Sequence, residues 1–164
     1  MTRFSDIEIN ELVREPKPLS LGWESRILDR STMRYVKKSF DVKGIKNNTF
    51  RVIWRQIYSN SSDFCAIFGV IPFGSNTLFR LRRYDSKHIH TNPLEKQKFN
   101  DFHIHKATER YQEYGTKEED KYAETTNRFS DLTGALQCLF RDCYFQMPAR
   151  QLSLFPDEGE QLWL

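Results

Sequence analysis

From Met33 onward, apolar and polar residues alternate with a period of two, which is the pattern of strands that bury one face. The segments MRYVKKSFDV (33–42) and TFRVIWRQIY (49–58), separated by Gly44 and Asn47-Asn48, predict an antiparallel hairpin. Phe64–Ile71 and Thr77–Tyr84 predict a second hairpin that turns at residues 72–76, and Asp101–Ala107 predicts a fifth strand.

Helical signals flank this strand-rich region on both sides. Ser5, followed by Asp6, Glu8 and Glu11, predicts a capped helix that ends before Pro16. After Ser130-Asp131, apolar residues recur at helical spacing and predict a helix that packs on the sheet: Leu132, Ala135, Leu136, Leu139 and Cys143. Residues 112–124 lack periodicity and predict a loop or a short solvated helix that contributes little to the core.

These patterns predict an α+β fold, with a five-stranded, mainly antiparallel sheet flanked by an N-terminal and a C-terminal helix. We expect a single domain over residues 1–147 and a C-terminal tail over residues 148–164. The first residues contain no apolar run typical of a signal peptide, and no 18 apolar residues follow one another, so we expect a cytoplasmic protein without a membrane partner. The 3 cysteines form no CxxC pair and are expected to be free thiols.

The net charge of +3 conceals an uneven distribution. Residues 31–110 contain 15 Lys and Arg against 6 Asp and Glu, whereas residues 111–164 contain 5 against 10. A basic, strand-rich middle indicates a surface for a polyanion such as a nucleic acid, although solvated cations on strand faces give the same count.

All 4 histidines lie within residues 88–105, as the segments HIH and HIH. Because side chains alternate along a strand, His103 and His105 share a face, opposite Phe102 and Ile104. The same parity, continued through Tyr84, places Arg80, Arg82, His88 and His90 on one face, with Phe79, Leu81 and Ile89 on the core side. We therefore expect four imidazoles and two guanidiniums on one solvent-facing surface.

Two kinds of chemistry fit this constellation. Cleavage of RNA by its own 2′-hydroxyl needs a base, an acid and cations, so His88, His90, His103 and His105 are candidate catalytic residues without a cofactor. Alternatively the histidines bind a divalent metal, because His88-Ile89-His90 followed by Glu95 resembles the first metal motif of cupins, without its glycines or the second motif. A purely structural or binding role remains a third reading. Arg80, Arg82, Lys106, Arg110 and Tyr111 are the candidate substrate-binding residues.

The segments LFRLRRYDSKHIHTN, FHIHKATERYQE and YAETTNRFSDLTGALQCLFRDC resemble an uncharacterised domain family of bacteria and their phages, over roughly residues 78–143. That resemblance implies a functional centre without naming its chemistry. A looser similarity, to small toxin proteins of toxin–antitoxin loci, implies action on RNA.

The tail contains Gln151-Leu152-Ser153-Leu154-Phe155, which resembles the pentapeptide by which bacterial DNA-handling proteins bind the replication sliding clamp. Gln151 would occupy a polar subsite, and Leu152, Leu154 and Phe155 would supply the apolar contacts. The competing reading is that this segment packs on the protein's own core.

Together these features favour a small nucleic-acid-directed effector, most simply a metal-independent endoribonuclease of toxin type. The alternative is a non-enzymatic binding protein in phage–host conflict that engages a host protein or the sliding clamp. The sequence leaves the oligomeric state open.

Overall fold

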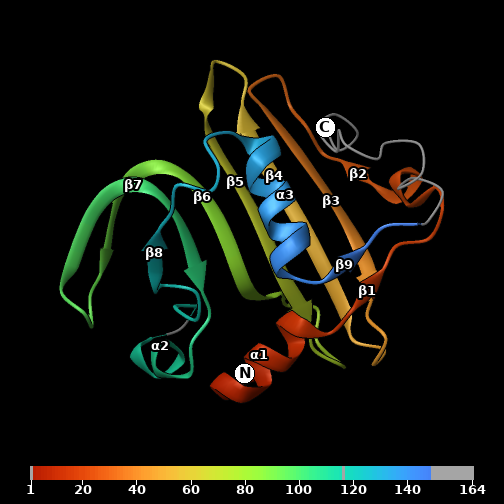
Figure 1. Ribbon diagram of the computed structural model, residues 1–164, viewed down its shortest axis with the longest axis horizontal. Coiled ribbons are helices and arrows are strands. Elements are labelled where there is room, and N and C mark those ends of the chain that lie inside the picture. Colours follow the sequence, from red (N-terminus) through yellow and green to blue (C-terminus); the bar gives the residue numbers. More distant parts are fainter. Residues whose placement is uncertain (1, 116, 149–164) are drawn as a thin grey trace.

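The computed structural model describes residues 2–115 and 117–148 (Figure 1). Its elements, in chain order, are α1 (Asp6–Arg14), β1 (Lys17–Pro18), the 3-10 helix η1 (Trp23–Arg26), β2 (Leu28–Asp29), β3 (Tyr35–Lys43), β4 (Thr49–Ile57), β5 (Asn60–Ile71), β6 (Phe79–Asn92), β7 (Gln97–Lys106), α2 (Glu109–Tyr114), β8 (Ala123–Thr125), α3 (Leu132–Asp142) and β9 (Phe145–Gln146).

Among the described residues, seven strands form one sheet in the order β2-β3-β4-β5-β6-β7-β8, and every neighbouring pair is antiparallel. The α+β class and the antiparallel sheet agree with the sequence prediction, but the predicted number of five strands is wrong. The two additional strands, β2 and β8, are only two and three residues long. They add to the sheet edges through long-range pairing, for which the local sequence carries no periodic signal.

Local sequence rules account for the predicted helices and hairpins. Ser5 and Glu8 form a reciprocal capping box at the start of α1, and Asp131 caps α3 by accepting a hydrogen bond from the Gly134 amide. The turn between β3 and β4 contains Asn47 at a φ of 67°, a conformation that asparagine tolerates better than most residues.

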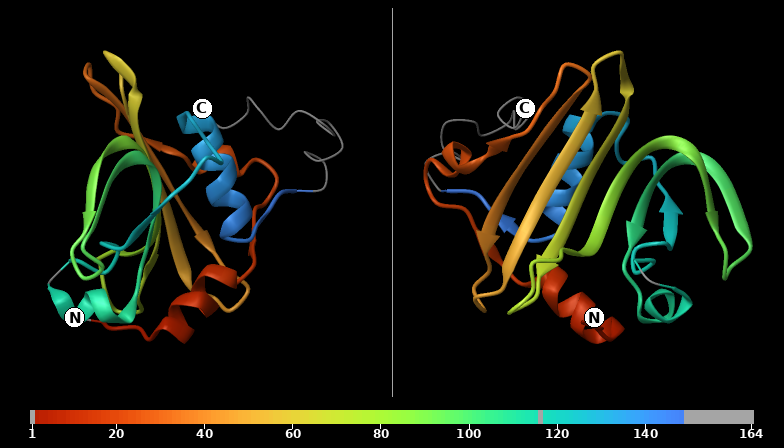
Figure 2. Two further views of the ribbon diagram at one scale, coloured as in Figure 1. Left: turned by 60° about the vertical axis from the view of Figure 1, so that its left-hand side comes forward. Right: turned by 180° about the vertical axis from the view of Figure 1, so that it is seen from behind.

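The core lies between one face of β3–β6 and the layer formed by α1, α3 and the small parallel β1–β9 sheet (Figure 1). Even-numbered residues of β4 and β5 point into it, including Phe50, Val52, Trp54, Phe64 and Phe68, and they pack with Leu136, Leu139 and Phe140 of α3. In the view from behind, α3 lies on the far side of β3–β5, so the opposite face of these strands is turned to the viewer (Figure 2). We call this opposite face the outer face.

β6 and β7 are longer than the predicted strands and bend strongly out of the plane of β3–β5 (Figures 1 and 2). Residues 112–124, predicted as a loop or a short solvated helix, contain the end of α2 and the start of β8. As predicted, none of the described residues in this range belongs to the hydrophobic core cluster, but Glu119, Asp120 and Ala123 are buried. No helix of the described residues is long and apolar enough to span a membrane.

Candidate functional site

Four histidines from two neighbouring strands converge at the curled end of the sheet. The ring centroid of His103 lies 4.6 Å from that of His88, 5.2 Å from that of His90 and 4.9 Å from that of His105. β6 and β7 pair directly, so the two HIH segments lie on adjacent strands as the composite arrangement required. We call these four residues the histidine cluster.

A β-bulge in β6 determines which residues join the cluster. Asp85 pairs with His103 and His88 pairs with Asp101, so Ser86 and Lys87 together lie opposite Phe102. The extra residue shifts the alternation by one position, so Arg83 and Asp85 before the bulge share a face with His88 and His90 after it. The bulge therefore adds a carboxylate and a guanidinium that strict alternation would have placed on the other face.

The two arginines predicted for this surface are not both there. A second irregularity, in which Phe68 pairs with Arg82 and Gly69 with Arg80, puts Arg80 and Arg82 on opposite faces. Arg80 faces the histidine side but forms ion pairs of 3.1 Å with Glu119 and Asp120. Arg82 shares the core side of β6 with Tyr84. The prediction that Arg80 and Arg82 lie on one face is therefore wrong.

The remaining predicted substrate-binding residues make contacts outside the cluster. Lys106 pairs with Arg82 in the register and forms an ion pair with Glu124. Arg110 forms an ion pair with Glu95, and the Tyr111 hydroxyl donates a 2.6 Å hydrogen bond to the same carboxylate. Glu95 is therefore held by α2 and is not directed to the histidines.

The cluster is largely buried, contrary to the expected solvent-facing surface. His103 and His105 are 0% exposed and His90 is buried, whereas the side chain of His88 is 49% exposed. Ile89, predicted to face the core, pairs with Asn100 and lies on the face of Phe102 and Ile104, but it is 62% exposed. Only the His88 end of the cluster is thus open to solvent.

Backbone carbonyls and the side-chain amide of Asn92 hold the three buried imidazoles. His103 Nδ1 lies 2.7 Å from the Asp101 carbonyl oxygen, and His105 Nδ1 lies 2.8 Å from the Asp120 carbonyl oxygen. His90 Nε2 lies 3.0 Å from both the Lys121 carbonyl and Asn92 Oδ1. These oxygens only accept, so each of these ring nitrogens carries the proton.

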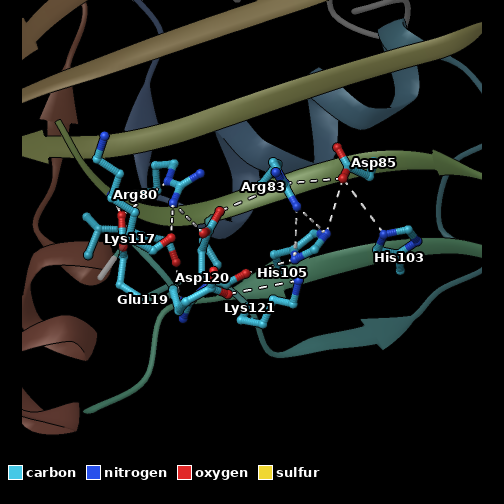
Figure 3. Close-up of polar contacts among 12 residues, drawn as sticks. Arg80, Arg83, Asp85, His103, His105, Lys117, Glu119, Asp120 and Lys121 are labelled. Atoms are coloured by element: carbon cyan, nitrogen blue, oxygen red, sulfur yellow. Dashed lines mark hydrogen bonds and ion pairs between the residues drawn. The ribbon is translucent and has the colours of Figure 1, made fainter. Parts of the chain in front are cut away.

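The remaining polar groups of the site surround Asp85. Its Oδ2 lies 3.1 Å from His105 Nε2, 3.8 Å from His103 Nε2 and 4.0 Å from His88 Nε2. Arg83 bridges the same region, with Nε 3.2 Å from Asp85 Oδ2 and Nη2 2.8 Å from His105 Nε2 (Figure 3).

Burial sets the protonation of the site. It lowers the pKa of His90 and of His103, and it lowers the pKa of His105 to about 4. Burial alone would raise the pKa of Asp85, but its contact with His105 and the charge of Arg83 outweigh it and leave that pKa lowered. Near neutral pH the imidazoles of His90, His103 and His105 are therefore neutral and lie beside a carboxylate.

Two sets of side chains bring their ligand atoms within 4.8 Å of one another: His90, His103 and His105, and Asp85, His88 and His103. His103 Nε2 is also buried without a hydrogen-bond partner among the described residues. These are the residues that could hold a metal ion.

Sequence reasoning missed Arg83, Asp85, Asn92 and the carbonyls of Asp120 and Lys121. An acidic residue within the strand-like run RRYDSKHIH was an available signal for Asp85, because a carboxylate in a buried strand requires a partner. The backbone groups carry no sequence signal. The predicted clamp-binding residues Gln151, Leu152, Leu154 and Phe155 lie outside the described residues.

Compared with protein-family models, curated proteins and solved structures, the chain matches none of them. The resemblances to a bacterial and phage family and to small toxins therefore stay predictions.

Proposed function

We propose that this chain binds a single strand of nucleic acid on its outer face and cleaves a phosphodiester bond at the histidine cluster. The observation that supports this proposal is the continuity of the two surfaces. Cross-strand pairing links basic residues on the flat part of the sheet to the histidines at its curled end.

Two transverse rows make this link. The Lys37 row runs across the strands β3 to β7 as Lys37, Arg55, Cys65, Asp85 and His103. The Ser39 row runs beside it as Ser39, Ile53, Ile67, Arg83 and His105. Because paired strands lie about 4.8 Å apart, Arg55 is roughly 14 Å from His103, which is within the span of a few nucleotides.

The charge and exposure of the outer face suit a phosphate backbone. Lys37 and Arg55 are exposed and lie next to each other in the Lys37 row. Arg51 also faces this side, but Asp41 neutralises it through a bidentate ion pair. Half-buried Ile53 and Ile67, in the neighbouring Ser39 row, offer apolar area against which bases can pack.

A phosphodiester that follows the Lys37 row reaches the open end of the cluster, where His88 is exposed and Arg83 lies beside Asp85. A metal-independent mechanism needs two accessible imidazoles, one as base and one as acid. His88 alone among the four is exposed, so burial favours a different role for His90, His103 and His105.

Binding is tested by fluorescence anisotropy with labelled single-stranded RNA and DNA at several salt concentrations. The double variant Lys37→Glu/Arg55→Glu should bind at least about 10-fold more weakly, with a shallower salt dependence, because it removes two phosphate contacts. The matched control is Arg14→Glu/Arg141→Glu, which makes the same charge change at exposed positions of α1 and α3. Equal loss of affinity in both double variants would show only a net-charge effect and would reject the outer face.

Cleavage of the bound strand separates the enzymatic proposal from a non-enzymatic binder. An enzyme should lose turnover when a cluster histidine is replaced, whereas a binder should tolerate that change and respond only to charge reversal on the outer face. Binding without cleavage under all metal conditions would leave the binding role and remove the catalytic one.

A further inference from the structure

We propose that His90, His103 and His105 form a binding site for a divalent first-row transition metal, with Asp85 as the fourth ligand. The site stands on its own geometry, and only its catalytic use rests on the proposed function.

The first argument is the convergence of three nitrogen ligands. The ligand atoms of His90, His103 and His105 lie within 4.8 Å of one another. A metal–imidazole bond is about 2.0–2.1 Å long, so each ring must move inward by roughly 0.7 Å to reach a shared ion. Movements of this size need no change in the strands that carry the rings.

The second argument is that hydrogen bonds fix the tautomers of all three rings. The protonated nitrogens, His90 Nε2, His103 Nδ1 and His105 Nδ1, each face a backbone carbonyl at 2.7–3.0 Å. The other nitrogen of each neutral ring therefore carries a lone pair. Metal-bound histidines almost always donate their second N–H to such an acceptor, which orients the ring and raises its basicity.

Asn92 provides a second acceptor for the N–H of His90. Its amide is oriented by Ala123, whose N–H donates to Asn92 Oδ1 at 2.9 Å and whose carbonyl accepts from Nδ2 at 2.8 Å. Asn92 Oδ1 can therefore only accept from His90 Nε2. The lone pair of His90 is left on Nδ1.

The third argument is a surplus of electron-pair donors in a buried space. His103 Nε2 has no hydrogen-bond partner among the described residues, although the side chain is 0% exposed. In neutral His105, Nδ1 carries the proton and donates it in a hydrogen bond to the Asp120 carbonyl. The lone pair of Nε2 therefore faces the Asp85 carboxylate at 3.1 Å. Such opposed acceptors repel each other unless a cation lies between them.

Arg83 supplies that cation in this structure. Its Nη2 lies 2.8 Å from His105 Nε2, and its Nε lies 3.2 Å from Asp85 Oδ2. Asp120 Oδ2 is buried, has no hydrogen-bond partner among the described residues, and lies 3.8 Å from Arg83 Nε. When a metal occupies the space between the histidines and Asp85, the Arg83 guanidinium can therefore pair with Asp120 instead.

The ligand set indicates which ion fits. Three imidazoles and one carboxylate favour Zn²⁺, Co²⁺ or Fe²⁺ over Mg²⁺ and Ca²⁺, which prefer oxygen ligands. When bound, such an ion acts as a Lewis acid toward a phosphoryl oxygen or a water molecule. His88, at the exposed end of the cluster, is then free to transfer a proton.

The test uses the full chain after treatment with chelator and its removal. Co²⁺ is titrated with visible d–d absorption as the readout, and Zn²⁺ with isothermal titration calorimetry. We expect one ion per chain, and a melting temperature that rises with the concentration of free Zn²⁺. His103→Asn and His90→Gln should each weaken binding by at least about 100-fold, while Thr91→Ala, an exposed control on β6 outside both ligand sets, should change it by less than about 5-fold.

Arg83→Met gives a second, independent expectation. Because Arg83 competes for the same space, its removal should tighten Co²⁺ binding by about 10-fold. Each variant is compared by circular dichroism, and the melting-temperature shift of the wild-type chain with Zn²⁺ decides the case if a histidine variant does not fold.

The absence of stoichiometric binding and of a thermal shift in the wild-type chain would overturn the metal site. So would full binding in both His103→Asn and His90→Gln, and Arg83 would then be the permanent cation of the cluster. Nucleic-acid affinity of the metal-free chain is measured separately. Normal nucleic-acid binding without metal binding rejects this inference alone, and metal binding without nucleic-acid affinity rejects only the proposed function.

Discussion

His103 Nε2 lies 3.8 Å from Asp85 Oδ2 across the β6–β7 pair, although strict alternation from His88 back along β6 would place Asp85 on the opposite face of the sheet. The bulge at Ser86 and Lys87 reverses that parity. One extra residue therefore converts a row of imidazoles into a mixed site with a carboxylate and a guanidinium. Ile89 lies on the face of Tyr84 and Ile104, opposite the histidines, and is 62% exposed.

His88→Ala is predicted to separate activity from stability. The side chain is 49% exposed, so its removal should change the free energy of unfolding by no more than about 0.5 kcal/mol. Cleavage of labelled single-stranded RNA should fall at least about 10-fold, because the proposed mechanism has no other accessible imidazole. The control is Lys87→Ala at the exposed neighbouring position, and unchanged cleavage in His88→Ala would remove this residue from the mechanism.

His103→Ala should behave differently in the same assays. Its ring is 0% exposed, so truncation leaves a cavity in a polar cluster and should cost about 1–3 kcal/mol. Loss of activity in this variant alone therefore cannot identify a catalytic residue. Stability close to that of the wild-type chain in urea unfolding would contradict the buried position of the ring.

Asn92→Ala is predicted to release β8 from the sheet edge. Asn92 is 0% exposed and exchanges two hydrogen bonds with Ala123, in addition to its contact with His90. Leaving these backbone groups unpaired should cost about 2–4 kcal/mol. Urea unfolding measures the loss, and hydrogen exchange should be faster at the Ala123 amide, with Thr91→Ala as the exposed control. A change below about 0.5 kcal/mol would mean that Asn92 does not hold β8.

Lys17 is predicted to stabilise the junction between α1 and α3. Its buried ammonium donates to the carbonyls of Val13 at 3.0 Å and Cys143 at 2.8 Å, which lie at the ends of the two helices. Lys17→Met leaves these carbonyls without that donor and should cost about 2–4 kcal/mol near neutral pH. Denaturant unfolding at pH 7.5 measures this loss.

The same lysine predicts a pH dependence. Burial lowers the pKa of Lys17 from 10.5 to about 8, so between these values the unfolded chain binds the proton more tightly than the folded chain. This contribution to stability therefore rises as the pH increases from about 8 to 10.5, by roughly 2 kcal/mol between pH 7.5 and 9.5. Subtracting the profile of Lys17→Met cancels other titrating groups, and identical profiles would show that burial does not perturb Lys17.

The tail prediction is independent of the described structure. A peptide spanning residues 150–157 should bind a bacterial sliding clamp with micromolar affinity, and replacing Leu154 and Phe155 together by Ala should remove that binding. If the segment instead packs on the protein's own core, the double substitution in the full chain should lower the melting temperature. A destabilised chain without clamp affinity would reject the partner hypothesis.

The sequence by itself determined the elements whose signals are local. The capping box of Ser5 and Glu8 defines the start of α1, and period-two alternation with turn residues defines the two hairpins β3–β4 and β5–β6. Alternation also requires His103 and His105 to share a face. These results depend on residues a few positions apart, so a single chain segment contains the necessary information.

Only the tertiary structure decided which groups surround the histidines and how deeply they are buried. The bulge after Asp85, the pairing of the three-residue strand β8 and the approach of the Asp120 and Lys121 carbonyls arise from contacts between segments 15 to 31 residues apart. These features are stabilised by hydrogen bonds and burial that exist only when β6, β7 and the segment after α2 are assembled. For that reason the sequence predicted a solvent-facing row of imidazoles, whereas folding produces an enclosed cluster with three oriented lone pairs.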